Sequence, residues 1–226
     1  MPAKLVPEGA AGAWVKSVNI GALAPNPAKD NMTAIAKRPA EGAVWARAPG
    51  ALKGRSGLDG DAIGDHEHHG GNDQAVYAFG REDLDRWEVE LGRTLPDGSF
   101  GENLTTLGID PNRALIGERW QVGAELLLQV TSPRLPCRTF AAKMAEPGWA
   151  RRFTESGRPG AYLKVLRPGP VRAGDAITVV RRPAHGVDIT TALYALTIEP
   201  KLLGDLLAAG DDLSVEMRES IEASLK

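Results

Sequence analysis

Cys137 is the only cysteine among the 226 residues, and it lies in the segment 132–138 (SPRLPCR). Two prolines fix the backbone there and remove main-chain donors. Arg134 and Arg138 place positive charge nearby, which lowers the pKa of a thiol and favours the thiolate that attacks electrophiles or binds metals. This context indicates a functional thiolate. A buried structural cysteine, common in cytosolic proteins, is the alternative.

A histidine cluster occupies the segment 66–73 (HEHHGGND). It matches neither the EF-hand loop nor the zincin helix, because the spacing of the ligand residues differs from both. Zinc binding through His66 and His68 stays open although no third ligand is evident, and a solvated polar loop is the alternative. His69 differs because two glycines follow it, and they would let a substrate or cofactor approach the backbone closely.

Asn103, in the segment 101–104 (GENL), offers a donor and an acceptor that suit the edge of a heterocycle, although a turn at a strand edge explains it equally well. The chain has no Walker A loop, no Gly-x-Gly-x-x-Gly that opens a helix and no Gly-x-Ser-x-Gly elbow. Neither an ATP site, a Rossmann dinucleotide site nor an α/β-hydrolase site is therefore indicated.

The composition excludes several classes of protein. A net charge of -2 and scattered basic residues give no pull toward nucleic acid or anionic membranes. A single cysteine excludes an intrachain disulfide and an all-cysteine zinc or iron–sulfur site. Residues 1–13 lack the pattern of a signal peptide, and the apolar runs are too short to span a bilayer. We expect a cytoplasmic protein with a small-molecule or protein partner, and no nucleic-acid or membrane partner.

Frequent Gly and Pro, 26 and 16 residues, indicate many short strands and turns. β-branched content and alternation predict strands over 13–20, 33–37, 43–48, 124–131, 161–166 and 176–181. Apolar spacing predicts a helix over 81–91 and a shorter one over 147–155.

The composition changes after residue 185. Three short helices are predicted over 189–196, 200–209 and 214–224, with Asp188, Pro200 and either Asp212 or Ser214 at their beginnings. The expected organisation is a β-rich domain over 1–185, followed by a small three-helix appendage over 186–226.

Four motifs together resemble a known family. The segments 58–61 (LDGD), 69–75 (HGGNDQA), 100–104 (FGENL) and 133–137 (PRLPC) are similar, in order and spacing, to the MOSC domain, the molybdenum cofactor sulfurase C-terminal type. The similarity runs over nearly the whole chain, and the helical tail resembles that of the YiiM-like branch. It implies a mainly β fold with α, a MOSC-type β-barrel followed by a small C-terminal three-helix bundle.

The resemblance also implies a function. It predicts binding of a molybdopterin-type molybdenum cofactor, and reduction of N-hydroxylated purine analogues such as 6-N-hydroxylaminopurine to the harmless amine. By motif position, the molybdenum ligand falls on Cys137 and a catalytic histidine on His69. A further catalytic lysine falls on Lys37, at the end of the segment 33–37 (TAIAK).

The chemistry of these side chains agrees with such roles. A thiolate is a soft ligand for a thiophilic metal, and histidine exchanges protons near neutral pH, as protonation of a departing oxygen requires. Lys37 is expected to orient His69 or to supply charge. The cofactor-binding candidates are Cys137, Arg134, Arg138, Asn103 and Asn72, with the two arginines assigned to the phosphate group and Asn103 to the pterin. For Arg138, a solvent-facing charge is an equal alternative.

Electrons for such a reduction must come from a separate flavoprotein or ferredoxin-like partner, because the chain has too few cysteines for an iron–sulfur cluster and no evident flavin site. No pyridoxal-phosphate domain is evident either, so a complete cofactor sulfurase is not expected. One rival hypothesis is a molybdenum cofactor carrier or a sulfur relay that uses a Cys137 persulfide. A second is a zinc-binding protein that uses His66, His68 and His69. The sequence does not predict the oligomeric state.

Overall fold

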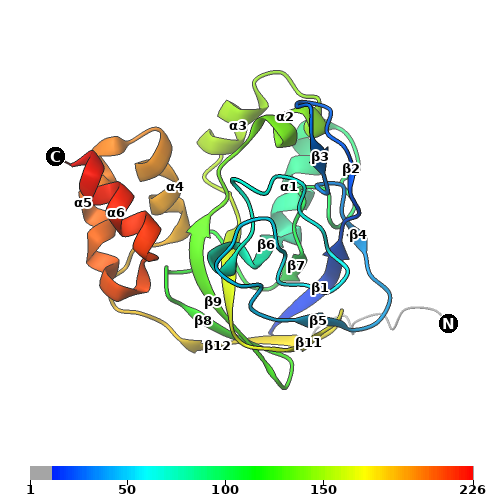
Figure 1. Cartoon of the computed structure of the whole chain (residues 1–226), viewed down its shortest axis with the longest axis horizontal. Coiled ribbons are helices and arrows are strands. Elements are labelled where there is room, and N and C mark those ends of the chain that lie inside the picture. The colour runs from blue at the N-terminus through cyan, green and yellow to red at the C-terminus, as the bar shows by residue number, and fades with distance from the viewer. Residues whose placement is uncertain (1–11, 226) are drawn as a thin grey trace.

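A closed β-barrel forms the centre of the protein, in a computed structural model that describes residues 12–225 (Figure 1). Seven strands follow one another around it: β12 (Ala176–Arg181), β8 (Arg119–Val122), β9 (Leu126–Pro133), β10 (Ala161–Arg167), β6 (Val76–Gly80), β7 (Leu104–Leu107) and β1 (Ala13–Ile20). The ring closes where β1 pairs with β12. The predicted mainly β fold with a barrel and C-terminal helices is therefore confirmed.

Neighbouring strands of the barrel are antiparallel except β6 and β7, which run parallel. The helix α1 (Arg81–Leu91) joins these two strands and supplies the crossover that a parallel pair needs. The smaller elements are β2 (Ala24–Pro25), β3 (Met32–Thr33), β4 (Arg38–Pro39), β5 (Val44–Ala46), η1 (Asn72–Gln74), β11 (Gly169–Val171), α2 (Arg138–Met144) and α3 (Trp149–Glu155). Of these, β2 and β3 form a small hairpin outside the barrel.

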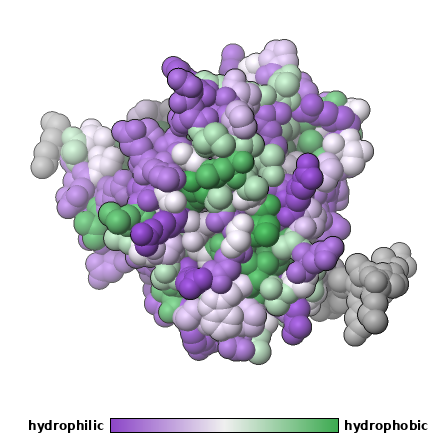
Figure 2. Space-filling model, turned by 45° about the vertical axis from the view of Figure 1, so that its right-hand side comes forward, coloured by the Kyte–Doolittle hydropathy of each residue, from purple (hydrophilic) through white to green (hydrophobic). Residues whose placement is uncertain are grey.

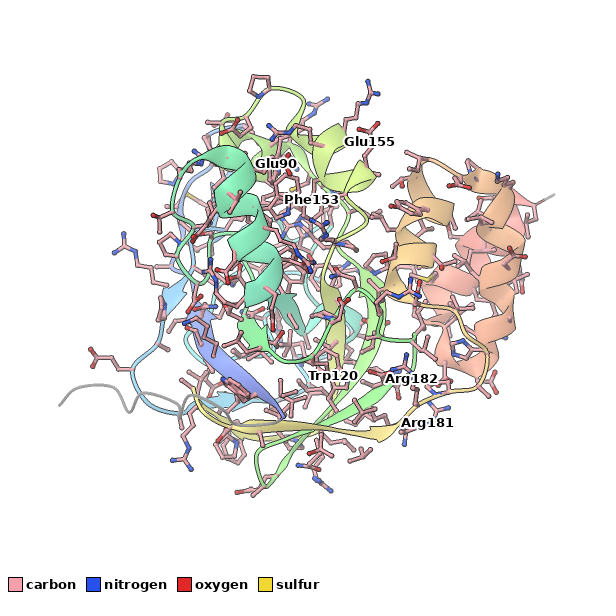
Figure 3. The ribbon with its side chains drawn as sticks, turned by 180° about the vertical axis from the view of Figure 1, so that it is seen from behind. Glu90, Trp120, Phe153, Glu155, Arg181 and Arg182 are labelled. Carbon is pink, nitrogen blue, oxygen red and sulfur yellow. The ribbon has the colours of Figure 1, made fainter. Side chains whose placement is uncertain are left out.

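Alternation along the strands divides the apolar residues into two clusters. On β6, Val76 and Ala78 belong to the barrel interior, whereas Tyr77 and Phe79 belong to a second cluster outside it. Helices α1, α2 and α3 cover this outer cluster, and their aromatic side chains pack edge to face within it. Figure 3 shows one of them, Phe153 of α3. A strand buried on both faces is thus held between two hydrophobic layers.

The C-terminal helices lie on one side of the barrel (Figure 1). They are α4 (Ile189–Thr197), η2 (Pro200–Leu202), α5 (Leu203–Leu206), η3 (Leu207–Asp212) and α6 (Val215–Ser224). Their buried residues Leu206, Ala209 and Ile221 belong to the same hydrophobic cluster as the barrel interior. The domain boundary placed after residue 185 stays a prediction.

Ion pairs secure the point where the chain leaves the barrel. Arg181 pairs with Asp212 of the C-terminal segment at 2.8 Å, and Arg182 pairs with the buried Glu118 at 2.7 Å. Figure 3 shows both arginines where the chain turns from β12 toward the helices. The tail is therefore attached by charge as well as by apolar packing.

Two predicted elements differ from the structure. The strand expected over 33–37 is wrong, because only Met32–Thr33 is a strand and Lys37 N donates to Ile35 O at 3.0 Å, a tight turn that leaves the ladder. The helix expected over 200–209 is a series of 3-10 and α turns that continues to Asp212, with Gly210 (φ 53°) in a non-helical conformation.

No helix within residues 12–225 is long and apolar enough to cross a membrane. Figure 2 shows hydrophobic residues reaching the surface in limited areas between hydrophilic ones.

We expect Asp188→Ala to lower the free energy of unfolding by about 1 kcal/mol, because the Asp188 side chain accepts a hydrogen bond from Thr191 N at 2.8 Å and caps α4. Asp188→Asn keeps an acceptor at this position and should cost clearly less. Urea denaturation of both variants measures the difference. Equal losses would show instead that the ion pair with Arg113 dominates.

Candidate functional site

A pocket opens beside the barrel where the sequence motifs converge. The empty space inside it and at its open mouth amounts to about 680 Å³. The polar or ionisable side chains that line it include Asn26, Lys37, Ser56, Asp61, Asp65, His69, Gln74, Tyr77, Asn103, Arg134, Cys137, Thr139 and Tyr162. Five of the seven residues proposed from the sequence thus share one cavity.

Cys137 lies in this pocket at the N-cap position of α2, directly after the turn that follows β9. Burial by itself raises the pKa of the thiol. The interaction with the His69 side chain, the charge of Arg134 and a hydrogen bond from the Phe140 backbone outweigh burial and lower the pKa to about 6. The side chain is therefore a thiolate at neutral pH.

Arg134 is the fixed cation beside this thiolate. Its guanidinium lies 4.3 Å from the ring centroid of Phe140 and 5.3 Å from that of Tyr77, and Nη1 donates to Phe100 O at 2.8 Å. The residue is only 5% exposed. Its Nε is buried without a hydrogen-bond partner among residues 12–225. The protein thus leaves one hydrogen-bond donor of this buried cation unused.

The carboxylate of Asp61 joins four segments of the chain. Oδ1 accepts from Gly21 N at 2.8 Å and pairs with Lys37, while Oδ2 accepts from Ser56 Oγ at 2.6 Å and from Asn103 Nδ2 at 2.9 Å. The side chain is 1% exposed. A buried carboxylate with this many donors holds the walls of the pocket together.

Lys37 lines the pocket, but its charge is already paired. Burial lowers the pKa of this ammonium group, and the neighbouring Asp61 opposes that shift. The side chain is 8% exposed. Lys37 thus supplies a fixed positive charge to one wall. A second lysine that the sequence did not indicate, Lys143, donates to Ile35 O at 2.8 Å and holds the segment that precedes Lys37.

Asn103 also lines the pocket, with its amide engaged by protein groups at both ends. Oδ1 accepts from Tyr77 N at 3.1 Å, and Nδ2 donates to Asn19 O at 3.2 Å as well as to Asp61. The amide therefore connects β6, β1 and the loop that contains Asp61 by hydrogen bonds. A contact with a cofactor would have to replace one of these bonds.

Asn72 and Arg138 lie outside the pocket lining. Asn72 Oδ1 accepts from Gly50 N at 3.0 Å at the surface. Arg138 is the first residue of α2 and is exposed. Their predicted roles in cofactor binding find no support in the position of either side chain, and for Arg138 the solvent-facing alternative fits its exposure.

The histidines of the cluster separate in space. His69 lines the pocket, whereas His66 and His68 are exposed and bond to Ile63 O at 3.0 Å and to Asp65 Oδ1 at 3.1 Å. Within residues 12–225, no three His, Cys, Asp or Glu side chains are grouped so that they could hold a metal ion. The proposed zinc site therefore lacks its ligand geometry.

Gly70 lines the pocket next to His69, and its backbone also packs closely against another segment. Its φ is +83°, and a Cβ there would lie 2.6 Å from Arg55 O, so only glycine fits. The expectation that this glycine lets a substrate approach the backbone stays a prediction.

The hairpin of β2 and β3 contributes one wall that the sequence did not predict. Lys29 pairs with Asp65 at 2.9 Å, and Asn26 Nδ2 donates to Thr139 Oγ1 at 3.0 Å. These contacts connect the hairpin to both sides of the pocket. Tyr162 of β10 is another lining residue that sequence reasoning missed, although alternation with the buried Leu163 places it on the other face of the strand.

Comparisons with known proteins agree with this architecture. The family model of the MOSC domain matches residues 65–178, half of the chain. The uncharacterised protein YflK of Bacillus subtilis is 33% identical over 160 residues, which cover 71% of this chain and 69% of that protein. A protein of Gibberella moniliformis named reductase is 30% identical over 155 residues, 67% of this chain but only 26% of that protein.

A solved structure shows the same fold. The crystal structure of YiiM from Geobacillus stearothermophilus matches with a TM-score of 0.75 at 25% identity, over 95% of this chain and 100% of that chain.

Alkylation of Cys137 by iodoacetamide should follow a pH profile with a midpoint at about 6, because only the thiolate reacts. With a single cysteine in the chain, the measured rate reports this site alone. His69→Ala removes one stabilising interaction and should raise the midpoint. The control is the same titration in denaturant, where we expect a midpoint of about 8.5. Equal midpoints in the folded and denatured protein would contradict the assignment.

Asp61→Asn should destabilise the protein by about 3–5 kcal/mol, because it leaves the buried Lys37 without its counter-charge and places an amide where only acceptors fit. Asp59→Asn is the matched control two residues earlier. Its ion pair with Arg47 is solvent-exposed and should contribute little. Chemical denaturation of both variants tests the difference, and similar losses would refute a special role for Asp61.

Proposed function

Because this chain belongs to the MOSC domain family, we propose that it binds a molybdenum cofactor of the molybdopterin type and reduces N-hydroxylated purine bases such as 6-N-hydroxylaminopurine. The observation that carries the proposal is the Cys137 thiolate, which lies in a pocket beside His69 and Arg134. The relative named reductase supports an oxidoreductase.

The side chains of the pocket fit such a cofactor. Molybdenum in this cofactor is thiophilic, and Cys137 offers a soft anionic ligand. A metal that arrives within an organic cofactor brings ligands of its own, so one protein ligand is sufficient. Arg134 offers a buried cation with an unpartnered Nε, which suits an anionic group. The paired Lys37 adds a second positive charge to the lining of the pocket.

Reduction of an N-hydroxylated base consumes two electrons and two protons, and it breaks the N–O bond to give the amine and water. The cofactor supplies the two electrons when it is bound and reduced. Cys137 would hold the metal, and His69, next to that thiolate, would donate a proton to the departing oxygen. Lys37 orients these groups by its charge rather than by proton transfer, since its ammonium group is engaged by Asp61.

We further propose that a separate flavoprotein or ferredoxin-like protein supplies the electrons. The cytoplasm is the proposed compartment, since a reducing environment keeps the single thiol free. A cofactor carrier or a sulfur relay through a Cys137 persulfide is the second candidate. The low pKa of the thiol favours it equally, because a thiolate is also the nucleophile of sulfur transfer.

Protein produced in a host that makes the cofactor should contain molybdenum and reduce 6-N-hydroxylaminopurine with an artificial electron donor. Cys137→Ser should abolish molybdenum loading and turnover. His69→Gln should keep the metal but slow turnover by roughly 10²–10⁴-fold, the usual contribution of a general acid. Metal analysis and single-turnover assays measure both effects.

The rival functions give different results in the same experiment. Molybdenum bound without turnover would favour the carrier, and zinc without molybdenum would exclude the proposal. Normal loading of the Cys137→Ser variant would refute this residue as the metal ligand.

A further inference from the structure

We propose that the Tyr162 hydroxyl donates a hydrogen bond to the oxygen of the N-hydroxylated substrate and thereby selects it over the reduced base. The inference deepens the proposed function and rests on it. The observations that carry it are the position of Tyr162 on a central strand, its place in the pocket beside Cys137, and a hydroxyl that no protein group engages.

The backbone holds Tyr162 rigidly. Its strand β10 pairs with β6 on one side and with β9 on the other, and Tyr162 lies opposite Tyr77 and Ser132 in these ladders. Thr131 Oγ1 donates to Tyr162 O at 3.0 Å. The two tyrosine rings pack at a centroid distance of 5.1 Å. A group on two paired strands keeps its position better than one on a loop.

The side chain points to the reacting end of the pocket. Alternation along β10 directs Ala161 and Leu163 to the barrel interior and leaves Tyr162 among the aromatic side chains outside it. There it lines the pocket together with Cys137 and Arg134. The charges of both residues influence the pKa of Tyr162. A ligand that reaches Cys137 would therefore lie next to Tyr162.

The hydroxyl itself is unused. Tyr77 OH donates to Pro159 O at 2.7 Å, whereas the hydroxyl of Tyr162 has no hydrogen-bond partner within residues 12–225. Burial raises the pKa of Tyr162, so the hydroxyl keeps its proton at neutral pH. Tyr162 is partly buried, and its hydroxyl is not among the buried unpaired atoms of residues 12–225, so it is accessible from the pocket and free to pair with a ligand.

Substrate and product differ in one oxygen, which the substrate carries on its exocyclic nitrogen. The unused donor of Tyr162 would pair with that oxygen in the substrate and would lack it in the product. A site built to hydrogen-bond a group rejects the molecule that lacks it, because the donor then stays unpaired. His69 provides the proton and Tyr162 provides recognition, so the two residues have separate tasks.

The test compares the affinities of 6-N-hydroxylaminopurine and adenine for the cofactor-loaded protein without an electron donor, so that no turnover occurs. Calorimetry on the wild type should show tighter binding of the hydroxylated base. Tyr162→Phe should reduce this preference roughly three- to tenfold, the value of one neutral hydrogen bond, and should not weaken the binding of adenine, whose complex leaves the hydroxyl unpaired. Tyr194→Phe makes the same chemical change outside the pocket lining and should leave both affinities unchanged.

Each contrary result has a distinct meaning. An unchanged preference in Tyr162→Phe, or an equal loss of affinity for both bases, would overturn the inference and leave the proposed function intact. A wild type that does not prefer the hydroxylated base would overturn both.

Thermal stability provides a readout that is independent of substrate. Tyr77→Phe should lower Tm because Pro159 O loses its donor, whereas Tyr162→Phe should leave Tm unchanged. A comparable loss of stability in both variants would show that the Tyr162 hydroxyl has a protein partner, and would overturn the inference.

Discussion

The buried carboxylate of Asp61 is the interaction on which the pocket depends. A charge removed from water is tolerated only when donors replace its hydration, and Asp61 receives donors from three segments that are distant in sequence and from Ser56 of its own loop. Satisfying this one group fixes the end of β1, the 56–61 loop, Lys37 and Asn103 relative to one another. The same bonds hold together the part of the pocket lining that contains Lys37, Ser56 and Asn103.

The second constraint is the division of apolar residues between the interior and the exterior of the barrel. β6 is buried on both faces, and the outward tyrosines of β6 and β10 form the floor of the pocket. This floor stacks against Arg134 and keeps a cation away from bulk water. An aromatic layer of this kind strengthens the attraction between that cation and the Cys137 thiolate, because apolar surroundings screen charges less than water does.

Local sequence patterns predicted the elements with clear alternation or helical spacing. The bounds of β1, β12 and α1 agree with the prediction, and the cap of α6 is Ser214, one of the two residues predicted for that position. Sequence reasoning missed β6 (Val76–Gly80) because a strand buried on both faces has no polar alternation to show. The four-residue strands β7 and β8 are too short to reveal a period.

For the candidate site too, local sequence patterns predicted only part of the arrangement. The charge around Cys137 indicated a reactive thiol, but two arginines flank it in sequence, and only the fold shows which of them lies beside the thiolate. Arg134 leaves the end of β9 and turns into the aromatic cluster, whereas Arg138 begins α2 and faces solvent. The pairing of Lys37 with Asp61 joins two irregular segments, and no spacing rule predicts such a contact.

The polar groups of the pocket fall into two sets that follow from these constraints. Asp61, Asn103 and Lys37 have their hydrogen-bonding capacity engaged by protein, and they lie on the wall formed by loops. Arg134 Nε and the Tyr162 hydroxyl are unengaged by any group of residues 12–225, and they lie near the thiolate on the wall formed by β9, β10 and α2. Loops are held in place by hydrogen bonds of their side chains to other protein groups, whereas strands are already held by the backbone hydrogen bonds of the sheet. The ordered wall can therefore leave donors free for a ligand, and this is the physical reason to place recognition and chemistry on that side of the pocket.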